Sequence, residues 1–95
     1  MYGTIAKLRV KPGKIEELKQ WADRSEPPLG GVSIIAYQMD ADPSELYMAV
    51  LFESREAYVA NAQSPQQHER YLQILPLLEG EPEWHDGKVV SHKQF

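Results

Sequence analysis

Two neighbouring stretches of this sequence are apolar on both sides of an extended chain. Residues 32–39 and 46–52 are rich in β-branched and aromatic residues, which predicts two strands. In both stretches the odd and the even positions carry apolar side chains, whereas a strand with one face in water alternates apolar with polar residues. We therefore expect helices to cover one face of the sheet, and a second sheet or a ligand to cover the other.

The turn between these stretches and the strand before them complete the core of a sheet. Residues 40–43 contain two Asp residues and a Pro, which favour a turn and predict a hairpin. Residues 2–10 alternate with a period of two, which predicts a further strand with one apolar face. A helix is predicted from residue 15 to about residue 25, because Ile15, Leu18 and Trp21 recur at three-residue steps and two prolines follow.

Two further helical segments and a last extended segment follow the hairpin. Ser54 is expected to cap a helix over residues 55–62, and Ser64 to cap a second helix that begins at Pro65. The second helix is expected to kink or end at Pro76. In it an apolar stripe is expected to comprise His68, Tyr71, Leu72, Leu75 and Leu78. Over residues 83–90, the pair Asp86-Gly87 predicts a hairpin-type turn between two extended pieces.

The order strand, helix, strand, strand, helix, strand predicts an α+β fold. This order is that of the ferredoxin-like split βαβ plan, an antiparallel sheet with helices on one side. The 95 residues are expected to form a single domain, 1–95, and a domain this small often completes its core by association. We therefore expect the chain to pair with itself as a homodimer.

Composition excludes several classes of partner and chemistry. A net charge of −4 without a basic patch argues against nucleic acid. There is no cysteine, so neither disulfides nor thiolate chemistry is available. The three histidines lack the spacing of a metal site, so we expect no metal and no cofactor. With no signal-like N-terminus and no long apolar run, a cytoplasmic location without membrane contact is expected.

Several short motifs together resemble a known family. They are the turn Lys11-Pro12-Gly13-Lys14, the segment 52–57, the spacing from it to Ser64-Pro65 and His68, and the closing Gly80-Glu81-Pro82. With the length, these features resemble the antibiotic biosynthesis monooxygenase domain of the dimeric α/β barrel superfamily over nearly the whole chain. The resemblance implies that two ferredoxin-like chains pack sheet against sheet, which would cover the second apolar face.

The resemblance implies a range of activities. The family includes cofactor-independent oxygenases acting on quinol or polyketide aromatics, haem-degrading enzymes, isomerases and chains with no known activity. Phe52 stands where relatives often have Trp, Asn61 where many have His, and His68 matches a second common His. The haem-degrading branch carries an Asn on the first strand, where this chain has Lys7 or its neighbours. That branch also carries a Trp on a later segment, and the only late Trp here is Trp84. Both comparisons argue against haem degradation.

A cofactor-free oxygenase would take its electrons from the substrate, as a phenolate or enolate. It needs a base that titrates near neutrality, groups that hold the substrate oxygens, and a dry pocket. On this hypothesis His68 is the base, because imidazole is the side chain that titrates closest to neutral pH. Asn61 and Tyr71 would hold oxygens. The rings that would enclose a flat substrate are those of Phe52, Tyr37 and Tyr47.

Each of these residues also has a purely structural interpretation. A lone His among apolar residues is commonly a half-buried packing residue, and Asn61 before Ser64-Pro65 suits the end of a helix. The strand tyrosines suit a core or a dimer contact. Two functions therefore stay open: a homodimeric monooxygenase acting on a small aromatic or quinol-like molecule, and a non-catalytic dimeric barrel that binds a small molecule or serves as an interaction module.

Overall fold

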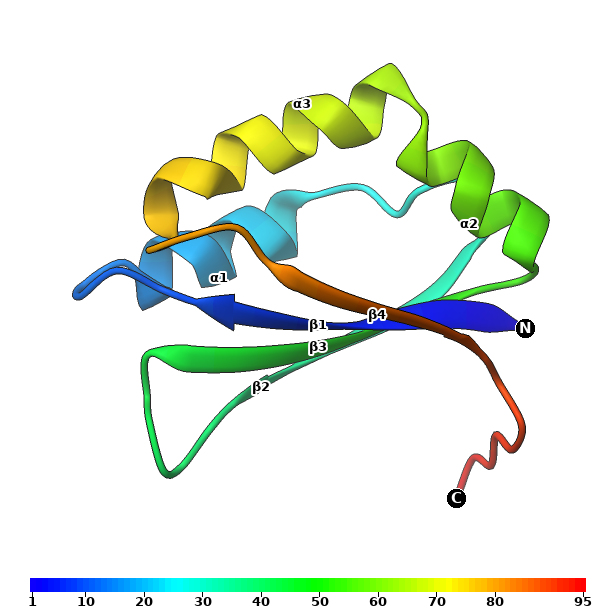
Figure 1. Ribbon diagram of the computed structural model, residues 1–95, viewed down its shortest axis with the longest axis horizontal. Coiled ribbons are helices and arrows are strands. Elements are labelled where there is room, and N and C mark those ends of the chain that lie inside the picture. Colours follow the sequence, from blue (N-terminus) through cyan, green and yellow to red (C-terminus); the bar gives the residue numbers. More distant parts are fainter.

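A computed structural model describes all 95 residues and shows one antiparallel sheet with the helices on one of its faces (Figure 1). The strands are β1 (Tyr2–Arg9), β2 (Gly31–Gln38), β3 (Glu45–Phe52) and β4 (Glu83–Lys88), in the spatial order β2-β3-β1-β4. The helices are α1 (Ile15–Arg24), α2 (Arg55–Ala62) and α3 (Pro65–Ile74), followed by the 3₁₀ turn η1 (Leu75–Leu77). The predicted α+β, ferredoxin-like fold is confirmed.

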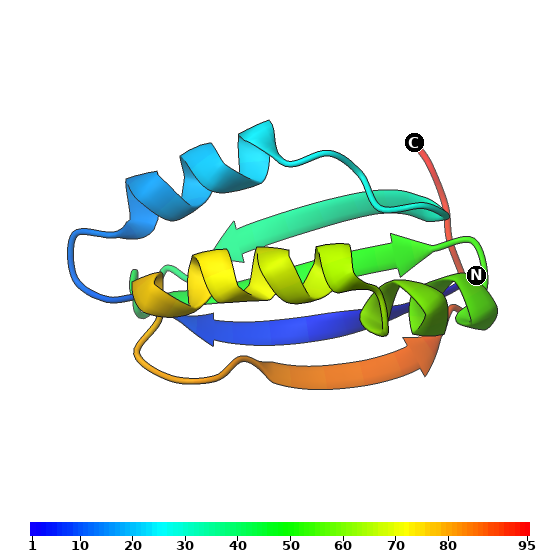
Figure 2. The ribbon, with the colours of Figure 1, turned by 90° about the horizontal axis from the view of Figure 1, so that it is seen from above.

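Alternation along β1 decides which side chains form the core. Thr4, Ala6 and Leu8 face the helices and are buried, whereas Ile5 between them faces the other way and is exposed. The helices supply the remaining core residues from the other side. The main cluster comprises Leu8, Val10, Leu18, Leu46, Ile74, Leu77 and Leu78. Seen from above, α3 lies over the middle of the sheet and α2 over the end where β3 finishes and β1 begins (Figure 2).

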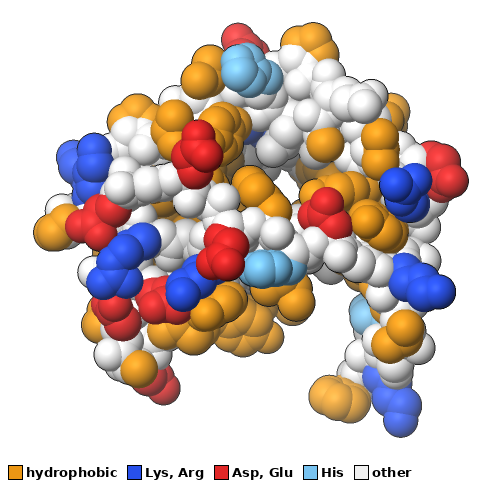
Figure 3. All heavy atoms as spheres, in the orientation of Figure 1, with side chains coloured by type: hydrophobic (Ala, Val, Ile, Leu, Met, Phe, Trp, Pro, Cys, Tyr) orange, Lys and Arg blue, Asp and Glu red, His pale blue; other side chains and the backbone are white.

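The second face of the sheet is left uncovered by the chain itself. Ile5, Ala49 and Ile35 lie side by side on β1, β3 and β2, and the exposed fractions of the two isoleucines are 53% and 52%. Tyr37 is 55% exposed next to Tyr47 on the same face. We call this face, with its row Ile5, Ala49, Ile35 and the pair Tyr37 and Tyr47, the open face. Hydrophobic side chains gather below the sheet in the space-filling view (Figure 3).

Both serine caps form as the sequence predicts. Ser54 Oγ accepts a hydrogen bond from the backbone N–H of Ala57 at 3.1 Å, and Ser64 Oγ accepts one from Gln67 at the same distance. Pro65 occupies the first turn of α3, where its missing N–H costs nothing. The α helix ends before Pro76, which lies in η1.

The predicted hairpin turn at Asp86-Gly87 is wrong. These residues lie inside β4, which pairs with β1 from Lys88 opposite Tyr2 to Glu83 opposite Lys7. Asp-Gly favours a turn only when nothing else competes for its backbone groups. Here the ladder to β1 does compete, and the Asp86 side chain has its own partner on α2.

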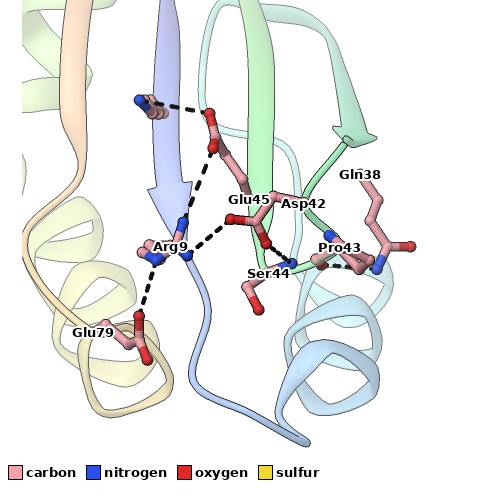
Figure 4. A network of polar contacts seen from close by, with 8 residues as sticks. Arg9, Gln38, Asp42, Pro43, Ser44, Glu45 and Glu79 are labelled. Carbon is pink, nitrogen blue, oxygen red and sulfur yellow. Dashed lines mark hydrogen bonds and ion pairs between the residues drawn. The ribbon is translucent and has the colours of Figure 1, made fainter. Parts of the chain in front are cut away.

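A network of ion pairs lies at the end of the sheet where β1 finishes (Figure 4). Arg9 contacts Asp42 at 2.8 Å and Glu79 at 3.1 Å, with Glu45 at 3.9 Å. A hydrogen bond from the Ser44 backbone N–H, together with Arg9, holds the pKa of Asp42 below its usual range. Exposed pairs add little to stability. The network therefore mainly fixes where the two neighbouring loops leave the sheet. None of the helices has the length and apolar character that crossing a bilayer requires.

Candidate functional site

Asn61 holds the corner between α2 and α3. Its side-chain Nδ2 donates a hydrogen bond to Gln67 Oε1 at 3.3 Å, and its backbone oxygen accepts one from Ser64 Oγ at 2.7 Å. The side chain is half-buried. These contacts are those of a helix end, so the structural interpretation of Asn61 has direct support.

His68 and Tyr71 do not share one face of α3. Tyr71 is half-buried, but His68 is exposed and its side chain forms no hydrogen bond or ion pair. Leu72 is also 51% exposed. The predicted apolar stripe is therefore wrong for His68 and for Leu72. The reason is the helix rotation of about 100° per residue. Ile74 is buried in the core, which turns Gln67 and Tyr71 inward and leaves His68 outside.

The three aromatic residues predicted to enclose a ring lie on opposite faces of the sheet. Phe52 faces the helices and is 2% exposed. Tyr37 and Tyr47 lie opposite each other on the open face. Within one chain these two tyrosines therefore cannot line the same pocket as Phe52.

A polar and aromatic cluster under α2 was missed at the level of the sequence. Tyr58 reaches down from α2, and its hydroxyl donates a hydrogen bond to Asp86 Oδ1 on β4 at 2.7 Å. Its ring lies 5.3 Å from the ring of Tyr2 and 5.4 Å from that of Phe52, centroid to centroid. Thr4 lies opposite Asp86 in the strand ladder, on the same face. We call Thr4, Tyr58 and Asp86 the α2 cluster.

Two features of the sequence could have indicated this cluster. Thr4 is the one polar residue on an otherwise apolar strand face, and Asp86 is a charged residue in an extended segment. Only the register between β1 and β4 shows that the two lie opposite each other. Because Asp86 was predicted to lie in a turn, its pairing with Thr4 could not be predicted from the sequence.

The α2 cluster changes the titration of Tyr58. Partial burial, reinforced by the hydrogen bond to Asp86, raises the pKa of Tyr58 to about 12 from an ordinary value of 10.0. The nearby Thr4 hydroxyl opposes this shift in part, although it does not meet the geometry of a hydrogen bond. A contact too poorly aligned for a hydrogen bond stabilises neither the neutral nor the ionised form of the phenol strongly.

Tyrosinate absorbance in the near ultraviolet tests this assignment. One of the five tyrosines is expected to titrate late, near pH 12, and Tyr58→Phe is expected to remove that component. The folded state favours the neutral phenol, so this group stabilises the fold fully below pH 10 and the contribution is lost as pH rises through about 12. Loss of the late component in Tyr37→Phe instead would contradict the assignment.

Two surface hollows are lined mostly by other residues, although Thr4 contributes to the second. A groove of about 450 Å³ runs between α1 and α3 and is lined almost entirely by polar side chains, among them Arg24, Glu69 and Arg70. A hollow of about 360 Å³ lies on the open face, between Ile5, Ile35 and the tail around His92. His68, Asn61, Tyr71 and Phe52 line neither. Between the helices and β4 the molecule is also hollowed, with hydrophobic side chains around the opening (Figure 3).

Comparison with solved structures decides the fold family. A putative antibiotic biosynthesis monooxygenase from Chloroflexus aurantiacus is 23% identical with a TM-score of 0.80, covering 98% of this chain and 96% of that one. One from Bordetella bronchiseptica is 17% identical with a TM-score of 0.82, covering 95% and 97%. The chain has the fold of the antibiotic biosynthesis monooxygenase domain.

That fold is shared by proteins with no named activity. A protein of unknown function from Nitrosomonas europaea is 15% identical with a TM-score of 0.77, covering 98% of this chain and 92% of that one. No family model matches the sequence, and no curated protein matches it. At these identities the monooxygenase fold is established, whereas the chemistry has to be argued from the site.

Proposed function

We propose that this chain is a cofactor-independent monooxygenase that acts on a small aromatic or quinol-like molecule. The observation that carries the proposal is the aromatic cluster of Tyr2, Phe52 and Tyr58 on the helix side of a monooxygenase fold. This cluster lies between α2 and the sheet and adjoins the polar groups of Thr4 and Asp86. Such a combination of apolar walls with a few polar groups is typical of a small-molecule site.

The chemistry needs no electron source other than the substrate. An activated methylene group of an anthrone-type substrate loses a proton, and the resulting carbanion reduces dioxygen. One oxygen atom becomes a new carbonyl group on that carbon and the other leaves as water, so that one CH₂ and one O₂ give one C=O and one H₂O. In this proposal His68 removes the proton, Asn61 and Tyr71 hold the substrate oxygens, and Phe52 contributes a wall.

Oxygen uptake tests the function. The purified protein, treated with a chelator, would be mixed with anthrones, naphthols and hydroquinones in an oxygen electrode. Protein-dependent uptake is expected, with one atom of the consumed dioxygen incorporated into the product. In His68→Ala the rate is expected to fall by at least about a hundredfold, because a general base contributes that much or more. His92→Ala in the exposed tail is the matched control and is expected to leave the rate unchanged.

One observation favours a second function, that of a non-catalytic binder. His68 is exposed and has no partner that orients it, whereas a general base is normally held in place by a neighbour. If His68→Ala keeps full turnover, the proposed base is wrong. If the aromatic molecules bind but no oxygen is consumed, the proposed oxygenase activity is wrong. Binding without any uptake supports the binder.

We also propose that the chain forms a homodimer through its open face. The row Ile5, Ala49 and Ile35 is apolar and has no cover within the chain. Charged groups, including Lys7 and Glu45 at 3.5 Å, lie at its rim. An apolar centre with a polar rim is the usual composition of a protein interface. In such a dimer Tyr37 and Tyr47 become interface residues.

A further inference from the structure

The buried hydroxyl group of Thr4 forms no well-aligned hydrogen bond within the chain, although it lies near the hydroxyl of Tyr58. Thr4 is 5% exposed, and its Oγ1 atom forms no hydrogen bond. Nearly all buried polar groups in folded proteins are hydrogen-bonded, because an unpaired one loses its water without compensation. A partner from outside the chain would satisfy this hydroxyl, and its neighbours decide what that partner can be.

The neighbours of Thr4 offer hydrogen-bonding groups that are still free. Tyr58 donates its hydroxyl proton to Asp86 Oδ1 at 2.7 Å, so the lone pairs on the Tyr58 oxygen can accept. Asp86 Oδ2 enters no hydrogen bond or ion pair. The Thr4 hydroxyl can donate and accept. A ligand hydroxyl group fits this set, because it accepts from Thr4 and donates to Tyr58 or Asp86.

The surroundings restrict the ligand further. The rings of Tyr2 and Phe52 flank that of Tyr58 at 5.3 and 5.4 Å, which supplies apolar walls. The Asp86 carboxylate repels an anionic group placed beside it. An uncharged hydroxyl group is therefore favoured over a carboxylate or phosphate.

A ligand would reach Thr4 through a movement of α2. Tyr58 comes from α2, a helix of eight residues in which no residue is fully buried. A helix that is held by few buried contacts opens more easily than the core around it. Its side chains can therefore move aside for a ligand while the sheet stays in place.

We propose that the α2 cluster, Thr4, Tyr58 and Asp86, is a binding site for an uncharged hydroxyl group of a small molecule. This inference rests on the proposed function and deepens it, because it adds a bound hydroxyl group of the substrate to the oxygens that Asn61 and Tyr71 would hold. The site lies at the start of β1 and on β4, under α2.

Amide NMR titrations of the full chain with three probes test the site. Phenol is expected to bind and to shift the signals of β1, α2 and β4. Anisole, which lacks the hydroxyl proton, and benzoate, which is charged, are expected to bind at least about tenfold more weakly. Equal affinity for phenol and anisole would overturn the proposal.

Thr4→Val is the decisive variant, because valine keeps the shape of threonine and removes only the hydroxyl group. The dissociation constant for phenol is expected to rise at least about tenfold. At the same time the denaturation midpoint of the free protein is expected to rise, because the unpaired buried group is gone. Thr4→Ser keeps the hydroxyl and is expected to restore phenol binding. If Thr4→Val binds phenol as tightly as the original chain, the hydroxyl holds at most a water molecule and the proposal fails.

Different results would contradict the oxygenase activity and the hydroxyl-binding site at the α2 cluster. Phenol binding that depends on Thr4, with no oxygen uptake from any substrate, supports this site and contradicts the oxygenase. Oxygen uptake with an unchanged KM in Thr4→Val supports the oxygenase and contradicts this site.

Discussion

Glutamate in place of Ile35 is expected to convert the proposed dimer into a monomer of 10.9 kDa. Ile35 lies in the middle of the open face, next to Ala49 on β3, and is 52% exposed in the single chain. In a twofold dimer the same patch meets itself, so each dimer would bury two unpaired carboxylates. We expect a loss of at least about 3 kcal/mol, which is more than about a hundredfold in Kd.

Sedimentation at micromolar concentration measures this change. Leu29→Glu is the matched control, because Leu29 is 96% exposed in the loop before β2 and lies outside the open face. This control is expected to remain dimeric. A protein that sediments as a monomer without any substitution would contradict the dimer, and an Ile35→Glu variant that stays dimeric would place the interface elsewhere.

Phe52→Ala is expected to destabilise the fold by about 3 to 5 kcal/mol. Phe52 is among the largest fully buried side chains, with 2% of its surface exposed. Its ring packs edge-on against that of Tyr58 at 5.4 Å, so the cavity would also remove the support under α2. Because domains are stable by only about 5 to 15 kcal/mol, this single change removes a large share of the total.

Phe95→Ala is the matched control for this prediction. Phe95 lies in the C-terminal tail and is wholly exposed, so the same chemical change there is expected to have no effect. Urea denaturation at one fixed protein concentration measures both variants, because the proposed dimer would make apparent stability depend on that concentration. Equal midpoints for the two variants would show that Phe52 is not part of the core.

Local sequence patterns were sufficient for the elements and the fold class. The alternation in residues 2–10 located β1 and its buried face, and the serines at 54 and 64 located the starts of α2 and α3. These features depend on periodicity and on capping, which involve residues close together in the chain. The apolar character of β2 and β3 on both sides also indicated that a second face needs cover, and Ile5 and Ile35 are exposed on that face.

The candidate site could not be predicted in the same way, because it is made by contacts between distant residues. Whether His68 faces inward depends on the rotation of α3, which the burial of Ile74 sets. That Tyr37 and Phe52 lie on opposite faces follows from the strand register.

The sequence by itself determined a ferredoxin-like sheet with helices on one side and with apolar residues on both faces. Only the tertiary structure placed Tyr58 of α2 at 2.7 Å from Asp86 of β4 and left the hydroxyl of Thr4 unpaired beside them. The physical reason is that backbone propensities act over a few residues. A hydrogen bond between residues 28 positions apart depends on how a helix and an edge strand pack on the same sheet.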